Sequence, residues 1–271
     1  MDVISAIILG LVQGLTEFLP VSSSGHLEIV KVLIGEENVA KKSMLMTVVL
    51  HFATALSTII IFRKDLVKII KGLFQYNDKE SFAFSFKIIL SMIPSAIVGF
   101  LFETEIESLF SGKLILVGGM LVITGFLLLL ADRSKATSKK VGIKESIIIG
   151  VSQAIAIVPG ISRSGATIST AVLLGVDKEK SARFSFLMVV PLIFGKMFKD
   201  ILSGEIGLNN SDFIILFVGF LTALVTGIFA CKWMIALVKS SNLKYFAYYC
   251  FGISFIIFII IFYETNNLYL T

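Results

Sequence analysis

The chain has 271 residues, of which 56% are apolar and 16% charged, and its mean hydropathy is +0.93. Soluble domains are roughly 45–50% apolar and about 25% charged, and a soluble fold of this length has no interior that could hide 24 phenylalanines besides its aliphatic residues. This composition excludes an ordinary soluble domain and predicts a multi-pass membrane protein. The net charge of +5 indicates no nucleic-acid partner, because the basic residues lie in short loops between apolar runs.

The N-terminal segment is expected to belong to the mature protein. Residues 3–12 are apolar, but no Lys or Arg precedes them, as one normally does in a secretory signal peptide. The two cysteines, Cys231 and Cys250, lie in apolar stretches without ligand-like spacing, so neither a disulfide framework nor a zinc site is predicted.

Six apolar segments approach the length of about 20 residues that a membrane-spanning helix needs. The predicted spans are 44–62, 86–102, 114–131, 184–198, 213–231 and 245–263. Two further apolar regions, 3–30 and 146–176, are interrupted by Pro, Gly and Ser, so neither is interpreted as one continuous spanning helix.

The loops between these segments predict the orientation of the chain. Lys and Arg concentrate in cytoplasmic loops, and the basic loops of this chain are 63–87, 132–144, 177–183 and 232–244. Residues 103–113 and 199–212 are mainly acidic and are therefore placed outside. Residues 31–43 do not fit this rule, since the alternation places their three lysines outside.

The two interrupted regions are related in sequence. Gly10-Leu-Val-Gln13 recurs as Gly150-Val-Ser-Gln153, and Pro20-Val-Ser-Ser-Ser-Gly25 recurs, one residue longer, as Pro159-Gly-Ile-Ser-Arg-Ser-Gly165. Three predicted spans follow each region, so the two halves must have opposite orientations in the bilayer. We expect one membrane domain, 1–271, built from inverted repeats at 1–132 and 145–264. Repeated broken segments of this kind indicate a binding site where they meet.

The breaks are suited to holding an anion. Pro20 lacks an amide hydrogen and ends the first half-helix, and the serines that follow are good N-caps for a second one. Pro159 and Gly160 end the matching half-helix in the second repeat. The amides and positive dipole ends at the starts of such half-helices favour an anion such as phosphate.

The side chains near the breaks have the chemistry of phosphoryl transfer. Glu17 precedes the first break in an apolar run, and ionisable groups at membrane depth usually serve a function. His26 shares a helix face with Ser22 and Ser23, and Arg163 offers a planar guanidinium for bidentate phosphate binding. Further hydroxyls come from Ser162, Ser164 and Thr167.

At these residues the chain resembles a known family. The segments from Gln13 to His26 and from Pro159 to Thr167 resemble the two signature motifs of bacterial undecaprenyl-diphosphate phosphatases of the bacitracin-resistance type, and the likeness in length and motif spacing extends over the whole chain. The resemblance implies an all-α integral membrane protein, an inverted-topology repeat with six transmembrane helices plus two re-entrant helix-loop-helix segments. It also implies hydrolysis of undecaprenyl diphosphate to undecaprenyl phosphate and inorganic phosphate, which recycles the lipid carrier for peptidoglycan synthesis and confers bacitracin resistance.

The resemblance further implies where the enzyme works and which residues act. It implies the bacterial plasma (inner) membrane, a site that opens toward the outer face, and a divalent cation, Mg²⁺ or Ca²⁺. By position, the catalytic residues are Glu17, Ser23, His26 and Arg163, and the substrate-binding residues are Ser22, Ser24, Ser162, Ser164 and Thr167. The metal ligands would be Glu17 and Gln13, where the chain has Gln at a position that is commonly Glu in the family. The partners are the isoprenoid diphosphate lipid and the bilayer, with a homodimer left open.

Our mechanistic hypothesis has Arg163 and the half-helix amides hold the terminal phosphate while Ser23 or a water attacks, with His26 handling the proton. The sequence does not decide between serine and water. His51 is interpreted as a satisfied interior histidine. A secondary transporter or lipid flippase has the same architecture and is the alternative, although a carrier needs no nucleophile. A structural scaffold leaves Glu17 and Arg163 at membrane depth unexplained.

Overall fold

The fold is described from a computed structural model of the chain, which covers residues 2–34, 40–74, 79–110, 113–135, 137–202, 213–239 and 242–268. All regular elements within these ranges are α-helices, and one isolated β-bridge joins Lys139 to Val176. The first half contains α1 (Val3–Thr16), α2 (Ser23–Leu33), α3 (Ala40–Ile61), α4 (Arg63–Phe74), α5 (Lys79–Leu101), α6 (Glu103–Leu109) and α7 (Leu114–Asp132). The second half contains α8 (Ile143–Ile155), α9 (Arg163–Leu173), α10 (Lys178–Leu202), α11 (Phe213–Lys239) and α12 (Leu243–Leu268).

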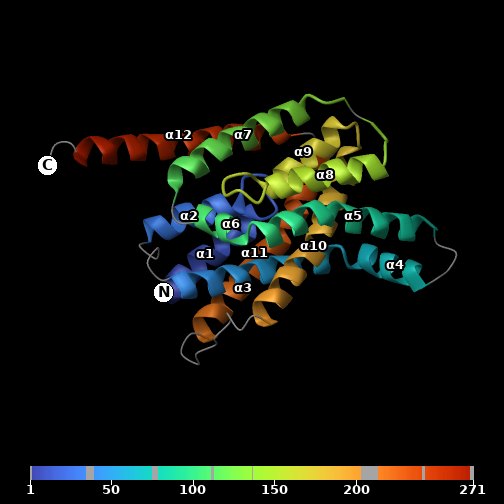
Figure 1. Ribbon diagram of the computed structural model, residues 1–271, viewed down its shortest axis with the longest axis horizontal. Coiled ribbons are helices and arrows are strands. Elements are labelled where there is room, and N and C mark those ends of the chain that lie inside the picture. The colour runs from blue at the N-terminus through green and yellow to red at the C-terminus, as the bar shows by residue number, and fades with distance from the viewer. Residues whose placement is uncertain are drawn as a thin grey trace.

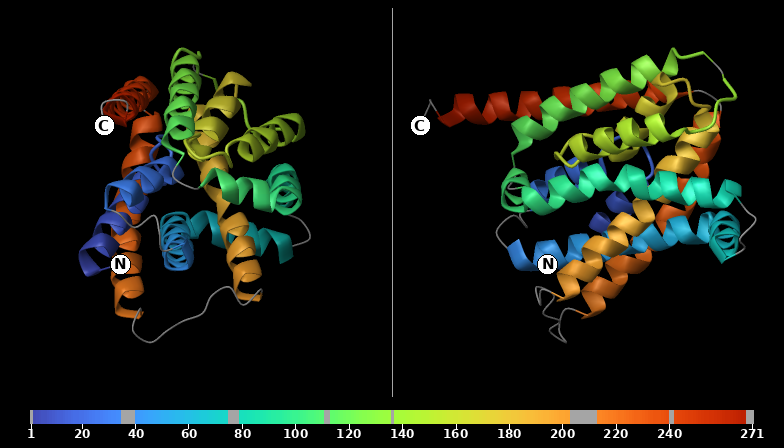
Figure 2. Two further views of the ribbon diagram at one scale, coloured as in Figure 1. Left: turned by 60° about the vertical axis from the view of Figure 1, so that its left-hand side comes forward. Right: turned by 45° about the vertical axis from the view of Figure 1, so that its right-hand side comes forward.

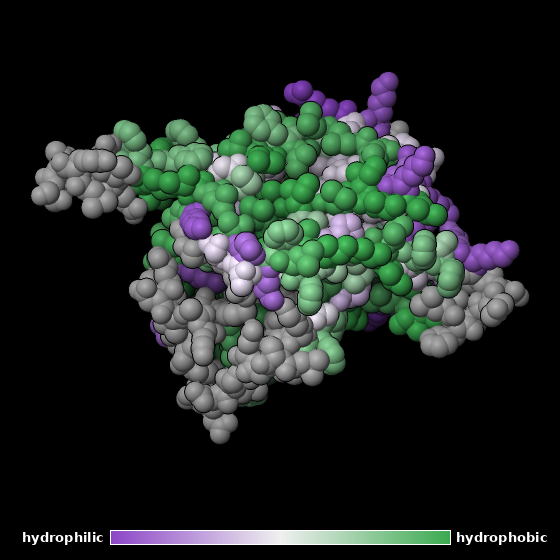
Figure 3. Space-filling view, viewed as in Figure 1, coloured by the Kyte–Doolittle hydropathy of each residue, from purple (hydrophilic) through white to green (hydrophobic). Residues whose placement is uncertain are grey.

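The helices confirm a multi-pass membrane protein. Four described helices, α5, α7, α11 and α12, are long and apolar enough to cross a bilayer, and a fifth candidate is α3 together with α4, which are bent by 75° at their junction. Large apolar side chains cover most of the face shown in Figure 3, and hydrophilic ones gather mainly toward the end that holds the loop between α7 and α8. An apolar exterior with polar ends is what a bilayer requires.

Both interrupted regions are broken as the sequence predicts, although each first half-helix ends four residues before its proline, Pro20 or Pro159. The chain leaves helix after Thr16 and resumes at Ser23, and it leaves helix after Ile155 and resumes at Arg163. Gly160 adopts φ +96°, a conformation that L side chains rarely adopt, and a Cβ atom there would lie 2.6 Å from the carbonyl oxygen of Val117. The second break therefore needs glycine both for its backbone angle and for its close approach to α7.

The helices of the two halves pack in corresponding pairs. The first half-helix of each half packs against the other half, α1 on α11 and α8 on α5. The next long helix of the first half, α3, also packs on α11, whereas α10 packs more on α3 and α9 than on α5. The last helices, α7 and α12, lie side by side and run in opposite directions in Figures 1 and 2. This arrangement carries the two breaks into the middle of the molecule, where they face each other.

Glycine permits the closest of these helix contacts. A Cβ atom at Gly150 of α8 would lie 2.4 Å from the carbonyl oxygen of Ser91 in α5. At Gly14 of α1 it would lie 1.9 Å from the Thr226 hydroxyl oxygen in α11. Small residues let the helix backbones approach, which is how helices associate in a bilayer.

Candidate active site

The two breaks bring a carboxylate and a guanidinium together. Glu17 follows the last residue of α1, Arg163 is the first residue of α9, and Nη2 of Arg163 donates to Oε1 of Glu17. The Glu17 side chain is 4% exposed and that of Arg163 is 28% exposed, so the carboxylate lies behind the guanidinium. A buried charge at this depth requires a partner, and the opposite repeat supplies it.

The second carboxylate oxygen of Glu17 is held by residues of the first half. Oε2 accepts from the Ser23 hydroxyl at 2.7 Å and from Nε2 of Gln13 at 2.9 Å. Gln13 is fully buried and its Nε2 also lies 3.4 Å from Oγ1 of Thr54 in α3. The structure thus brings together four residues that the sequence singled out: Gln13, Glu17, Ser23 and Arg163.

The serines flanking each break have matching local roles. The Ser22 hydroxyl accepts from the amide of Gly25 at 3.2 Å, and the Ser162 hydroxyl accepts from the amide of Gly165 at 3.0 Å. In each repeat the hydroxyl two residues further on lies 3.3 Å from the capping hydroxyl: Ser24 beside Ser22, and Ser164 beside Ser162. Ser23 and Arg163 consequently occupy equivalent first positions, of α2 and of α9. At this position the first half of the chain has a hydroxyl group and the second half has a guanidinium.

Ser22 adopts an unusual backbone conformation at this point. Its φ is +71°, a positive value at a residue other than glycine. Such conformations cost of order 1–3 kcal/mol and cluster at functional sites. The strained turn at Ser22 sets the direction in which α2 presents Ser23 to Glu17.

Both ring nitrogens of His26 have hydrogen-bond partners outside the ion pair, and its catalytic role stays a prediction. Its Nδ1 lies 2.8 Å from the carbonyl oxygen of Ser22, and its Nε2 lies 2.9 Å from the Tyr249 hydroxyl of α12. The His26 and Tyr249 rings are also stacked, with centroids 5.6 Å apart. The spacing from the serines predicts only on which side of α2 the His26 side chain lies. Its partner, Tyr249, is determined by the packing of His26 against α12.

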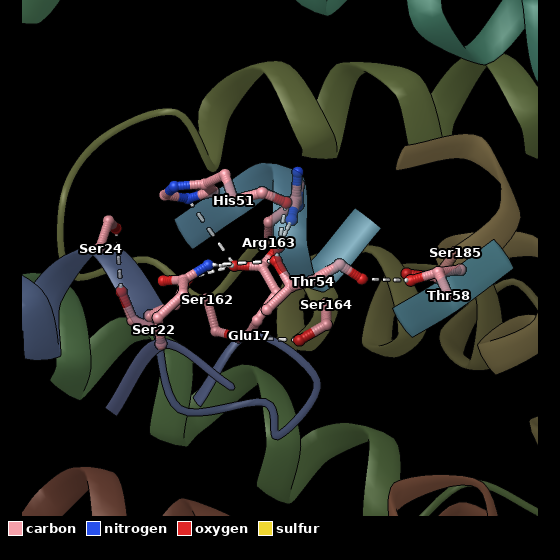
Figure 4. Close-up of polar contacts among 12 residues, drawn as sticks. Glu17, Ser22, Ser24, His51, Thr54, Thr58, Ser162, Arg163, Ser164 and Ser185 are labelled. Atoms are coloured by element: carbon pink, nitrogen blue, oxygen red, sulfur yellow. Dashed lines mark hydrogen bonds and ion pairs between the residues drawn. The ribbon is translucent and has the colours of Figure 1, made fainter. Parts of the chain in front are cut away.

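His51 is the histidine beside Glu17, although the sequence interpretation left it as an interior histidine. Its Nδ1 lies 2.8 Å from the carbonyl oxygen of Thr47, which satisfies that nitrogen as expected. Its Nε2 lies 3.8 Å from Oε2 of Glu17. Figure 4 shows His51 and Arg163 together at the Glu17 carboxylate. No motif marks His51, because it comes from α3 and reaches the site only through helix packing.

A narrow cleft with a mixed polar and apolar lining adjoins the ion pair. Its lining includes Glu17 and Arg163 with the hydroxyl groups of Thr54, Thr58, Ser164 and Ser185. Thr58 and Ser185 come from α3 and α10 and lie on the opposite side of the pair from His51 in Figure 4. The sequence does not predict these two hydroxyls as part of the site, because neither residue is adjacent to a break.

Thr167 is buried behind the cleft instead of lining it. Its side chain is 0% exposed, and its hydroxyl lies 2.8 Å from the Arg163 carbonyl oxygen and 2.6 Å from the Ser185 hydroxyl. Its contacts indicate that Thr167 holds the first turn of α9 and orients Ser185, whereas the sequence predicts direct binding to substrate oxygens.

The donor atoms at Glu17 fit a hard divalent cation. Mg²⁺ and Ca²⁺ prefer oxygen ligands and are often held by one or two carboxylates together with phosphate oxygens. Glu17 supplies the carboxylate, and Oε1 of Gln13 is buried without a hydrogen-bond partner among the described residues. Within those residues no cluster of three or more His, Cys, Asp or Glu side chains exists, so phosphate oxygens and water would have to complete the coordination.

Comparisons with known proteins identify the family of the chain. The family description "Bacitracin resistance protein BacA" matches residues 6–256. A protein of Christiangramia forsetii named undecaprenyl-diphosphatase is 60% identical over 95% of this chain and 98% of its own length. Proteins with the same name from Bacteroides fragilis and Methanobrevibacter smithii are 45% and 38% identical, over 92% and 95% of this chain and 95% and 97% of their own lengths. The chain belongs to the BacA family of bacitracin resistance proteins.

Proposed function

We propose that this chain hydrolyses undecaprenyl diphosphate to undecaprenyl phosphate and inorganic phosphate. The names of its relatives support this substrate, and the BacA family name supports a role in bacitracin resistance. The observation that carries the proposal is the pairing of Arg163 with Glu17 between two half-helix starts. The same hydrolysis returns the lipid carrier to peptidoglycan synthesis.

Arg163 and the half-helix starts are suited to hold the terminal phosphate. The guanidinium is 28% exposed beside the cleft, and it sits at the first position of α9, where backbone amides lack helical partners. Donors fixed before the reaction stabilise charge that develops on phosphate oxygens in the transition state. An incoming phosphate would share Arg163 with Glu17.

Ser23 and Glu17 are suited to deliver the nucleophile. The Ser23 hydroxyl already donates to Glu17 Oε2 at 2.7 Å, so the carboxylate can accept the proton when the serine oxygen attacks phosphorus. The new serine–phosphorus bond replaces the bond to the bridging oxygen, and undecaprenyl phosphate leaves. Water then releases inorganic phosphate from the serine. Direct attack by a water held on Glu17 gives the same products in one step.

Glu17 and Gln13 would hold the cation, and their oxygens fit it as described above. When bound, Mg²⁺ or Ca²⁺ would neutralise part of the diphosphate charge. His26 has a different part in this arrangement. By bonding the Ser22 carbonyl and the Tyr249 hydroxyl, it fixes the start of α2 against α12, and so positions Ser23.

The membrane architecture that goes with this function has six spans and two re-entrant segments in inverted repeats, 1–132 and 145–264. The spans are α3, α5, α7, α10, α11 and α12, and the corresponding helix pairs of the two halves support the inversion. The re-entrant segments are α1 with α2 and α8 with α9. Their helices have 11 to 14 residues, and at 1.5 Å per residue each is shorter than a hydrocarbon core of about 30 Å.

The basic loops support the orientation that a plasma-membrane enzyme with a site reached from outside would have. The loop at 137–142 lies at the basic end of the molecule, and α6 with its glutamates lies toward the opposite side (Figure 2, right). Under the positive-inside rule the basic end is cytoplasmic. Substrate whose diphosphate lies at the outer leaflet would reach the pair through the cleft that α3 and α10 line.

Phosphate release from C55 isoprenoid diphosphate by the purified protein tests the function. We expect release by the wild type with Mg²⁺ or Ca²⁺ and loss of release on adding a chelator. In Arg163→Ala we expect a decrease of at least about 100-fold, because the transition state loses a fixed positive donor to its phosphate oxygens. Arg133→Ala, at an exposed position after α7, is the matched control and should keep wild-type turnover. Absence of phosphate release by folded wild type would contradict the proposal and favour a carrier.

A further inference from the structure

A serine of α10 lines the cleft beside the ion pair and has no part in the functional steps above. Ser185 is 5% exposed, and it borders the same cleft as Glu17 and Arg163. In Figure 4 it lies on the opposite side of this ion pair from His51. The cleft thus receives a hydroxyl group from a long helix that belongs to neither broken segment.

The contact between Ser185 and Thr167 leaves the Ser185 hydroxyl able to bond a ligand. The two hydroxyl oxygens are 2.6 Å apart. A hydroxyl group has one donor and two acceptor positions, so this contact uses one of three. Thr167 is fully buried behind the cleft, whereas Ser185 lines it. A ligand in the cleft can therefore reach Ser185 but not Thr167.

The chain of hydroxyl groups through Thr167 can direct the Ser185 hydrogen toward an anion. The Thr167 hydroxyl lies 2.8 Å from the Arg163 carbonyl oxygen and 2.6 Å from the Ser185 hydroxyl, and its one hydrogen goes to one acceptor at a time. When Thr167 donates to Ser185, the Ser185 hydrogen is available to the cleft. The Arg163 carbonyl then still has its helical amide partner in α9. Hydrogen bonds to charged oxygens are roughly twice as strong as neutral ones, so a bound phosphate favours this arrangement.

The face that α10 presents to the cleft changes from polar to apolar along the helix. Val189 and Ile193 follow Ser185 at intervals of four residues, which share one helix face, and all three line the cleft. Through Thr167, Ser185 is joined to the turn of α9 that carries Arg163. This order matches a lipid diphosphate whose phosphates lie at the Arg163 end and whose apolar chain extends along Val189 and Ile193.

We propose that Ser185 binds a phosphate oxygen of the lipid diphosphate directly, and that Thr167 is the residue that positions its hydroxyl. The inference rests on the proposed function and adds a phosphate contact from α10 to those at the two breaks. Ser185 and Arg163 then hold the phosphate from two different helices. Contacts from two directions fix the orientation of the phosphorus for attack, which a single contact does not.

Binding of a substrate analogue that cannot be hydrolysed tests the contact. The probe is farnesyl methylenediphosphonate, in which a CH₂ group replaces the bridging oxygen, and its dissociation constant is measured by calorimetry in detergent with Mg²⁺. We expect Ser185→Ala to bind the probe at least about 10-fold more weakly than the wild type, because a hydrogen bond to a charged group is lost. Ser181→Ala is the matched control and should bind like the wild type. Ser181 lies one turn earlier in α10, is also buried, and donates to the Asp177 carbonyl oxygen.

A double-mutant cycle separates positioning from direct binding by Thr167. Thr167→Val keeps the shape of the side chain and removes its hydroxyl. If Thr167 acts through Ser185, the double variant Thr167→Val/Ser185→Ala binds the probe no more weakly than Ser185→Ala alone. Losses that multiply in the double variant would contradict the positioning role, because each hydroxyl would then act independently.

Two results would overturn the contact: wild-type affinity in folded Ser185→Ala, or an equal loss of affinity in Ser181→Ala. Melting temperatures show which variants are folded, and Ser185→Cys, which keeps only a weak donor, replaces Ser185→Ala if that variant is misfolded. Phosphate release from C55 isoprenoid diphosphate is measured on the same samples. Probe binding that depends on Ser185, without release by the wild type, rejects the phosphatase and keeps the contact. Release by the wild type with unchanged probe binding in Ser185→Ala rejects the contact alone, and a wild type that neither binds nor releases overturns both.

Discussion

Glu17 is the residue on which the contacts of the site converge. Arg163 binds one of its oxygens, and Ser23, Gln13 and the His51 ring surround the other. Four of these five residues could be predicted, because the two breaks repeat and carry polar groups in apolar surroundings. His51 could not, since one polar residue in a long apolar helix has many possible neighbours and only the packing of α3 against α1 selects one.

His26 illustrates the reverse case, a residue whose position was predicted and whose partner was not. Because its Nδ1 donates to the Ser22 carbonyl, its Nε2 must accept from the Tyr249 hydroxyl. Tyr249→Phe removes that donor and leaves a nitrogen of a largely buried ring unsatisfied, at a cost of about 1–3 kcal/mol.

We therefore expect Tyr249→Phe to lower the melting temperature by roughly 2–12 °C in detergent. Tyr248→Phe is the matched control, because Tyr248 is the neighbouring tyrosine on the same helix, is likewise exposed and does not bond His26, and it should melt like the wild type. Equal melting temperatures for the two variants would show that the bond between His26 and Tyr249 does not hold α2 in place.

At the scale of the helices, the sequence predicted the long elements better than the short ones. The predicted spans 114–131 and 86–102 correspond to α7 and α5, because a bilayer demands long apolar runs. The helices α4 and α6 lie in regions that the sequence assigned to loops. The polar residues of α4 and α6 predict that these segments lie in water. A short surface helix, however, also depends on contacts with neighbouring elements, which hydropathy along the sequence does not contain.

The contact between α5 and α8 gives a prediction at this scale. A methyl group at Gly150 would meet the backbone of Ser91, which cannot move aside as a flexible side chain could, with atoms at 2.4, 2.9 and 3.0 Å. Overpacking of this kind costs typically 1–3 kcal/mol. Gly150→Ala should therefore lower the melting temperature by roughly 2–12 °C for a chain of this size.

Two matched controls separate this clash from the general effect of alanine. Gly99 in α5 and Gly119 in α7 have no atom within 4 Å of an added Cβ. Alanine at either position should leave the melting temperature unchanged or raise it, since alanine favours helix over glycine. If the melting temperature of Gly150→Ala equals that of these controls, α8 does not pack on α5 as closely as the structure shows.

At the scale of the whole molecule, the basic loops of both halves meet at one end. Lys178 and Lys244 of the second half donate to Asp132 at the end of α7, through Nζ and the backbone amide respectively. Lys140 pairs with Glu80 at the start of α5. Charge alternation predicted that these loops share a side, and the contacts agree, but the sequence could not predict which loops touch.

Because the basic loops meet at one end of the molecule, we can predict which residues are accessible from each side of the membrane. The parent chain offers a low background for cysteine labelling, because Cys231 and Cys250 are both 0% exposed. Single cysteines replace Lys140 and Lys239 at the basic end and Glu105 in α6, all of which have exposed side chains. In bacterial spheroplasts, a membrane-impermeant maleimide should label Glu105→Cys directly. It should label Lys140→Cys and Lys239→Cys only after the membrane is permeabilised, since lysine-rich loops remain in the cytoplasm.

The pair of basic-end variants is what tests the inversion. Lys140 follows the last helix of the first half, and Lys239 precedes the last helix of the second half. If both residues are cytoplasmic, α7 ends on the cytoplasmic side and α12 begins there. These two equivalent helices then cross the membrane in opposite directions. The two breaks can accordingly approach the bilayer centre from opposite faces. Labelling of Lys140→Cys and Lys239→Cys on different sides would give the halves the same orientation. The meeting of Glu17 with Arg163 would then need another topology.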